Sequence, residues 1–242
     1  MRNLGKKNSV TKTIKGKRGF TLIELIIVIA IVVALVAMFL PLALNKIDES
    51  NVTRAKADVD ALATAVTSFF SSLGNFPSCD GADCNPLNDA ANNLRFLAVG
   101  TGTGDLSTVY PADSGALWSL TTQDDGTVPA RNNAFNHLAM NNPNANATPN
   151  EATTDYVTTR WKGPYISKLS EDPWGAAYIV HIGSMQNSGC PVGSTGAPPA
   201  CTAPATGRQG WILSAGPNGN LDTAPTATTL SADDIGYIFF TQ

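Results

Sequence analysis

Residues 17–44 read KRGFTLIELIIVIAIVVALVAMFLPLAL, and this stretch sets the architecture of the chain. A basic flank ends at Gly19, and the run from Phe20 to Leu44 is almost entirely apolar. A helix needs about 20 apolar residues to cross the hydrocarbon core of a bilayer, so this run is long enough to span a membrane. Glu24 interrupts it. An ionised carboxylate in a bilayer costs roughly 2.5–3.5 kcal/mol or more, so we expect this side chain to have a partner and a role.

A cleaved secretory signal or an ordinary membrane anchor would be simpler interpretations of the same stretch. A secretory signal has an apolar core of about 7–15 residues, followed by a small-residue cleavage site. Here the apolar run is longer, and no such site follows it. A plain anchor fits the length but does not require the carboxylate of Glu24. The pattern therefore favours a more specialised N-terminal segment.

The motif K-R-G-F-T-L-I-E, residues 17–24, resembles the processing site of type IV pilins and of the pseudopilins of type II secretion systems. The resemblance implies that a membrane peptidase removes a cytoplasmic leader, residues 1–19, by cutting after Gly19. It implies that Phe20 then becomes the N-methylated first residue of the mature chain. It also implies that Glu24 directs filament assembly. Charge, glycine, glutamate spacing and apolar length must all agree, so the match is specific.

Charge is distributed unevenly along the chain. Seven of the sixteen basic residues lie within residues 1–19, where there is no acidic residue. The remainder carries nine basic and nineteen acidic residues, a net charge of −10. Because basic flanks stay on the cytoplasmic side of a membrane, we expect everything after the apolar run to lie on the outer side. The resemblance implies a protein of the bacterial inner membrane with its head in the periplasm or outside, which after assembly becomes part of a periplasmic or surface filament. The acidic body argues against binding of nucleic acid, unless the protein is a surface pilin that takes up DNA.

The helical pattern continues beyond the apolar run. Apolar residues recur every three or four positions from Val52 to Leu73, which indicates one helical face, and Gly74 is a natural stop. We therefore expect residues 20–44, spanning the membrane or forming a filament core, and residues 45–74, the amphipathic half, to form one long helix. A following sheet should cover the amphipathic half.

Pro41 lies inside the expected helix and matches a proline common in the resembled family. Proline removes one backbone donor, so a regular helix has an unpaired carbonyl one turn earlier. A kink is one expected result. Local unwinding, as in the filaments of the resembled family, is the other.

Residues 75–242 are expected to form a globular head with an α+β fold, in which the long helix packs on a small antiparallel sheet, as in pilins. Residues 78–160 are rich in Asn, Asp, Gly, Thr and Pro, which predicts a variable loop region. Residues 161–242 should hold the sheet. The strand candidates are 177–180, 210–214 and 235–240. The apolar segments 94–100, 116–120 and 135–140 are expected to be short helices or strands, and 141–154 an exposed loop.

The C-terminal region narrows the resemblance. The sequence GPYISKLSEDPWGAAY, residues 163–178, looks like a stretch of the major pseudopilin of type II secretion. Residues 214–219, SAGPNG, followed by DDI at 233–235, look like the calcium loop of that protein. The resemblance does not extend to the long loop region or to the segment between the last two cysteines. Those departures leave room for a different type of filament.

A calcium ion is the one cofactor that the sequence suggests. Ca²⁺ takes six to eight oxygen ligands from carboxylates, amides and carbonyls. The resemblance implies four side-chain ligands, although an asparagine stands at 218 where the family usually has aspartate. From spacing alone, these residues would equally serve as ordinary turn formers. The four residues are Asn218, Asp222, Asp233 and Asp234.

Four cysteines, Cys79, Cys84, Cys190 and Cys201, follow the helix. An even number in an exported domain predicts disulfides, and four cysteines allow three connectivities. Pairing within 79–84 and within 190–201 closes two short loops, so we favour these pairs. A metal site is disfavoured because neither spacing is C-x2-C and the two histidines lack local ligand partners.

No catalytic motif is present: the sequence lacks H-E-x-x-H, a P-loop, G-x-S-x-G and a G-x-G-x-x-G that follows a strand. We therefore expect a structural protein. The C-terminal motifs favour the major pseudopilin, which helps export folded proteins. The long loop region and the disulfides favour a surface pilin for adhesion, motility or DNA uptake. A solitary membrane-anchored binding protein would require that Gly19 is never cut.

For both filament classes, the resemblance implies a homo-oligomeric filament assembled from the inner membrane. The implied partners are the prepilin peptidase and N-methylase, the assembly platform and the minor pilins.

Overall fold

The computed structural model describes residues 19–74, 76–77, 96–102, 105–113, 118, 120, 132–143, 145, 156, 159–167, 170–181, 209–224 and 227–241. The chain divides into two compact units, Met1–Ile47 and Asp48–Gln242. The four cysteines and the disulfides predicted for them lie outside the described residues.

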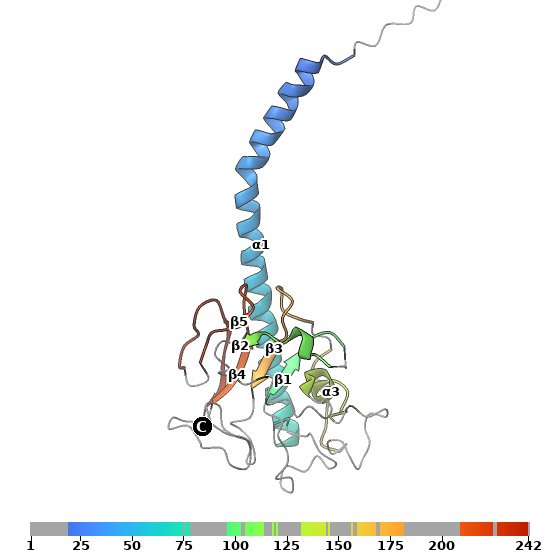
Figure 1. The fold of residues 1–242 in the computed structure, drawn as a ribbon. Coiled ribbons are helices and arrows are strands. Elements are labelled where there is room, and N and C mark those ends of the chain that lie inside the picture. Colours follow the sequence, from blue (N-terminus) through green and yellow to red (C-terminus); the bar gives the residue numbers. More distant parts are fainter. Residues whose placement is uncertain are drawn as a thin grey trace, which may run out of the picture. The chain divides into compact units, whose positions relative to one another are not determined.

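A single helix, α1 (Leu22–Leu73), includes both predicted halves and is 52 residues long. It is the long blue-to-cyan helix in Figure 1. In the first unit, all described side chains are exposed. Helix α1 runs through Pro41 without a break. In the second unit, the apolar stripe becomes the buried face of the helix. The buried stripe comprises Ala55, Val59, Leu62, Ala63, Ala65, Val66, Phe69 and Leu73.

A four-stranded antiparallel sheet with the order β1-β3-β4-β6 forms the centre of the head. Its strands are β1 (Phe96–Val99), β3 (Tyr178–His181), β4 (Gln209–Ser214) and β6 (Ile235–Thr241). The three predicted strands are confirmed as β3, β4 and β6. The apolar segment 94–100 supplies the fourth, β1, which pairs with β3. A short parallel pair, β2 (Ala112–Asp113) with β5 (Asn220–Leu221), forms a second sheet.

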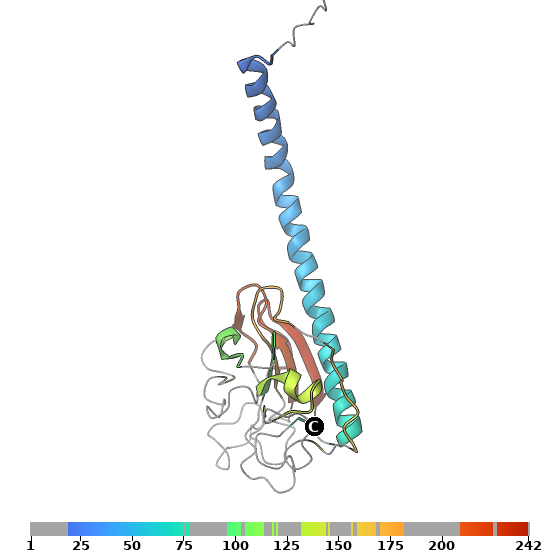
Figure 2. The same cartoon turned by 90° about the vertical axis from the view of Figure 1, so that its right-hand side faces the viewer.

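Strands β1, β3 and β4 are buried on both faces of the sheet, whereas Tyr237 of β6 is exposed. Alternate residues Leu97, Tyr178 and Ile212 join the core that contains the α1 stripe. Their neighbours face a second core with Trp118 and Leu120. Figure 2 shows α1 lying along the sheet. Burial on both faces explains why these strands are continuous apolar runs without alternating polar residues.

The predicted loop region, residues 78–160, contains regular secondary structure and buried residues that its polar composition did not predict. The segment 135–140 contributes the short helix α3 (Ala134–Leu138), whose first turn is capped by Asn133. A 3-10 turn, η1, spans Ser107–Val109. The expectation that 141–154 is exposed is wrong at its start, because Asn141 is fully buried. Its amide exchanges two hydrogen bonds with the backbone of Tyr156, which satisfies the buried polar group.

Candidate functional site

The predicted processing site lies immediately before α1. Gly19 and Phe20 are both exposed. A Cβ added at Gly19 would meet no atom of the described residues within 4 Å, so none of them requires glycine there. A requirement for glycine at this position would therefore come from outside the fold, as recognition by a peptidase would.

Glu24 forms a capping box with Thr21 at the start of α1. The backbone N–H and the hydroxyl of Thr21 both donate to Glu24 Oε2, each at 2.8 Å. In return, the Glu24 N–H donates to the Thr21 hydroxyl at 3.3 Å. This arrangement satisfies backbone donors that a helix N-terminus leaves unpaired. Our sequence interpretation missed this role, although the T-x-x-E spacing of residues 21–24 signals it.

The apolar half of α1 presents an unusually large hydrophobic surface. None of its most apolar stretch is buried by other described residues, and by length and composition the helix is long and apolar enough to cross a membrane. Large side chains from Phe20 to Ile47 are each more than half exposed. Soluble monomers rarely expose contiguous apolar patches of this kind. The segment therefore requires a lipid environment or neighbouring subunits.

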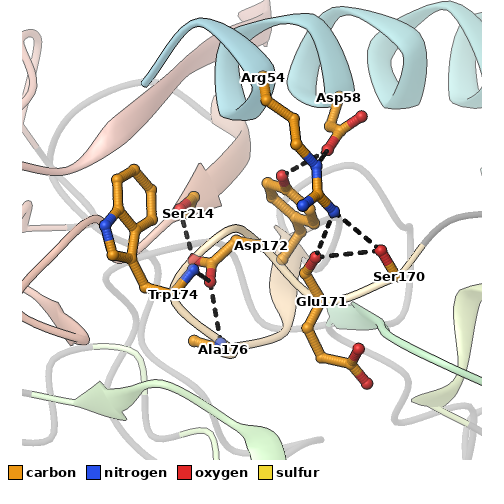
Figure 3. A network of polar contacts seen from close by, with 9 residues as sticks. Arg54, Asp58, Ser170, Glu171, Asp172, Trp174, Ala176 and Ser214 are labelled. Carbon is orange, nitrogen blue, oxygen red and sulfur yellow. Dashed lines mark hydrogen bonds and ion pairs between the residues drawn. The ribbon is translucent and has the colours of Figure 1, made fainter. Parts of the chain in front are cut away.

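The D-P-W-G segment forms a turn around the Asp172 carboxylate (Figure 3). Asp172 Oδ1 accepts hydrogen bonds from the backbone N–H groups of Trp174 (3.0 Å) and Ala176 (2.9 Å). Its Oδ2 accepts a hydrogen bond from the Ser214 hydroxyl at 2.7 Å. One buried carboxylate thus fixes the turn and ties it to the end of β4.

Arg54 links α1 to the segment just before this turn (Figure 3). Its Nη2 donates to the Ser170 hydroxyl at 3.0 Å and to the Glu171 carbonyl at 3.2 Å. Its Nε lies 3.5 Å from Asp58 Oδ2, which also accepts a hydrogen bond from the Tyr178 hydroxyl at 2.8 Å. Burial raises the pKa of Tyr178, and its hydrogen bond to Asp58 raises it further, so the hydroxyl remains a donor. We call this group the Arg54 clamp.

Hydrogen bonds join three of the four predicted calcium ligands, Asn218, Asp222 and Asp233. Asn218 Nδ2 donates to Asp222 Oδ2 at 2.8 Å and to Asp233 Oδ1 at 2.6 Å. The Asn218 backbone N–H donates to the other oxygen of Asp233 at 2.9 Å. Gly216 allows this approach, because it has φ +64° and a Cβ there would collide with the Asp233 carbonyl.

Asp234 lies beside this group and has an unusual environment. Its Oδ2 accepts hydrogen bonds from the backbone N–H groups of Asp222 (3.0 Å) and Thr223 (2.6 Å). Its Oδ1 is buried and has no hydrogen-bond partner among the described residues. Burial raises the pKa of this carboxyl, although its hydrogen bonds with Thr223 and Asp222 oppose the shift. A buried carboxylate oxygen without a partner, beside further oxygen-bearing side chains, is chemically suited to a hard cation.

The arrangement is not yet a coordination sphere. Within the described residues, no group of three His, Cys, Asp or Glu side chains is placed to hold a metal ion. The Asn218 carboxamide separates the carboxylates, because its nitrogen lies between Asp222 and Asp233. Its oxygen accepts a hydrogen bond from the Asn220 N–H at 2.6 Å. Calcium binding would therefore require this carboxamide to turn.

A groove of about 570 Å³ adjoins the acidic loops. One wall belongs to the amphipathic half of α1, and the other to the loops and the start of β6. The lining includes Val52, Lys56, Leu230, Asp233, Asp234 and Tyr237.

Comparison with known proteins identifies related sequences. Residues 14–40 match the family model described as the prokaryotic N-terminal methylation motif. The chain is 41% identical over 90 residues to the type IV narrow pilus major component of Thermus thermophilus, covering 36% of this chain and 74% of that protein. It is 37% identical over 82 residues to the toxin coregulated pilin of Vibrio cholerae, covering 34% of this chain and 36% of that protein's length. No solved structure gives a significant match.

Proposed function

This chain belongs to the type IV pilin family, and from this premise we propose that it is the major subunit of a pseudopilus in a type II secretion system. Its relatives are pilus proteins, so the chain is a structural subunit and not an enzyme. The observation that favours the pseudopilin is the assembly of both C-terminal motifs into one framework. The Asp172 turn bonds to Ser214, the first residue of the S-A-G-P-N-G loop, and that loop closes on Asp233.

Filament growth would use the exposed half of α1. After cleavage at Gly19, the apolar helices of adjoining subunits would bury one another in the filament core. The Glu24 carboxylate would then face the α-amino group of Phe20 on a neighbour, because two opposite charges in an apolar environment are each costly alone. The capping box uses only Oε2 of Glu24, so Oε1 is left for this partner.

Calcium binding to the C-terminal loops is part of the proposal. Asn218, Asp222, Asp233 and Asp234 would supply its side-chain ligands. The bound ion would neutralise neighbouring carboxylates of these loops, which lie beside the groove. Support for this site comes from Asp234 Oδ1, which has no hydrogen-bond partner among the described residues, and from the convergence of the three other side chains.

A surface pilin is the second candidate. It is favoured by the names of the two relatives, each of which is a component or pilin of a pilus. The long polar region at 78–160 and the cysteine pairs would suit a subunit exposed outside the cell.

A gene deletion, complemented by the wild type or by Glu24→Val, tests the two candidates. For a pseudopilin, the deletion should retain normally secreted proteins inside the cell, and only the wild-type gene should restore their export. For a surface pilin, the secreted proteome should stay unchanged while surface fibres disappear. Unchanged secretion together with lost fibres would overturn the pseudopilin in favour of the pilin.

A further inference from the structure

The carboxamide of Asn218 occupies the position that a cation would need in order to bridge Asp222 and Asp233. Its two N–H groups point to one oxygen of each carboxylate, at 2.8 Å and 2.6 Å. The hydrogen bond from the Asn220 N–H to its oxygen sets the orientation of the amide. All the polar groups of this side chain are therefore used within the loops.

An aspartate could not make the same contacts. A carboxylate only accepts hydrogen bonds, whereas asparagine has two donors and one acceptor oxygen. With aspartate at 218, three carboxylates would meet where the structure has two carboxylates joined by a donor. Their mutual repulsion would favour an open loop unless a cation were bound. Hydrogen bonds to charged acceptors are about twice as strong as neutral ones, so the carboxamide is an effective link.

We propose that Asn218 is a built-in substitute for the cation: it closes the C-terminal loops by hydrogen bonds and so makes the fold of the head independent of calcium. A second consequence, a lowered affinity for calcium, rests on the proposed calcium site. Calcium would have to displace the two hydrogen bonds of the carboxamide before it could bind, so Asn218 lowers both the affinity for calcium and the stability gained from it.

The test is thermal unfolding of the full chain in detergent micelles, followed by tryptophan fluorescence, with calcium and with chelator. The wild type should have nearly the same melting temperature in both conditions. Asn218→Asp should melt roughly 5 °C lower than the wild type in chelator, as expected for loss of two charge-assisted hydrogen bonds in a protein of this size. Millimolar calcium should restore most of that loss in the variant.

Asn220→Asp is the matched control, because it adds the same charge two residues away while leaving the Asn218 carboxamide in place. Its melting temperature in chelator should stay near that of the wild type. Asn218→Ala, which removes the donors without adding charge, should also melt lower in chelator and gain little from calcium. If Asn218→Asp does not fold under either condition, the melting temperature of Asn218→Ala in chelator tests whether Asn218 closes the loops.

Two results separate this inference from the calcium proposal. If Asn218→Asp melts lower in chelator but ignores calcium, the loops bind no calcium and the role of Asn218 in closure stands. If Asn218→Asp and Asn218→Ala both melt like the wild type in chelator, the substitution role is wrong, whatever calcium does. A wild type that needs calcium to fold would also overturn it.

Discussion

At the scale of single residues, some residues of the N-terminal motif stabilise the subunit itself, and others are exposed to its surroundings. Thr21 and Glu24 cap the helix within the chain, whereas no described residue lies close enough to Gly19 to require its small size. The cap was readable from the T-x-x-E spacing alone. The orientation of the Asn218 carboxamide could not be predicted from the sequence, because it depends on Asn220, Asp222 and Asp233, which meet it only after folding.

Gly19→Leu is expected to block processing without harming the fold. The space around Gly19 is open, so leucine should be accommodated in the unprocessed chain. Mass spectrometry of membrane fractions should then find the N-terminus uncleaved. A mature variant chain that begins at Phe20 would contradict cleavage after glycine as the required step.

Glu24→Gln distinguishes the helix-capping role of Glu24 from the role of its negative charge. Glutamine can occupy the third helical position of a capping box, so the helix start should remain intact, while the negative charge is lost. We expect both Glu24→Gln and Glu24→Val to be cleaved and inserted but to form no filaments by electron microscopy. Normal filaments from the glutamine variant alone would mean that the cap, and not the charge, supports assembly.

At the scale of elements, short apolar runs predicted the position of the strands well. Strands β3, β4 and β6 lie where runs of branched and aromatic residues predicted them. Strand β1 was ambiguous because a four-residue apolar run fits a helix equally well. The Arg54 clamp could not be predicted, since Arg54 and Ser170 are 116 positions apart. Nor could the buried start of the 141–154 segment, because only the bonds of Asn141 to Tyr156 make its polar side chain tolerable there.

Arg54→Ala should destabilise the head by about 1–2 kcal/mol, because two hydrogen bonds between α1 and the 170–171 segment are lost. For a protein of this size, that corresponds to a fall in melting temperature of roughly 3–6 °C. The ion pair with Asp58 should add little, since the Arg54 side chain is half exposed. Lys56→Ala, an exposed change of equal charge on the same helix, is the control and should shift melting less. Equal shifts would show that the clamp contributes no stability.

The stability contribution of Glu171 should depend on pH. Hydrogen bonding by the Thr101 N–H lowers its pKa below the ordinary value of 4.5, although partial burial opposes this. A carboxyl with a lowered folded-state pKa stabilises the fold above its ordinary pKa and loses that contribution as pH falls through the lowered value. The difference in melting temperature between the wild type and Glu171→Gln should therefore be largest at neutral pH and should shrink as the pH falls below 4.5 and through the lowered pKa. A difference that does not change with pH would contradict this assignment.

At the scale of the whole molecule, the two halves of α1 have different environments. The second half is covered by the sheet of its own chain, and its apolar stripe lies in the core. The first half is exposed along its length and can be buried only by lipid or by other subunits. One helix thus joins a self-contained head to a segment that depends on assembly. The helix pattern in the sequence was sufficient to predict this division.

The cysteine pairs remain a prediction for the whole head. Local disulfides would fix two segments that are too polar to hold themselves, each contributing about 2–3 kcal/mol for loops this short. Peptide mapping of the exported protein without reduction should find Cys79 joined to Cys84 and Cys190 joined to Cys201. Free thiols or crossed pairs would contradict the prediction.

The Arg54 clamp has a mechanical consequence for a filament under tension. A load pulling on α1 would act in shear on the contact between the helix and its own sheet. The hydrogen bonds of Arg54 and Tyr178 resist such sliding together with the packed apolar stripe, so they share the force in parallel and rupture together. Pro41 lies within the unsupported half, where proline has already removed one helical hydrogen bond. Extension should therefore begin near Pro41, and the head should stay attached while the filament lengthens.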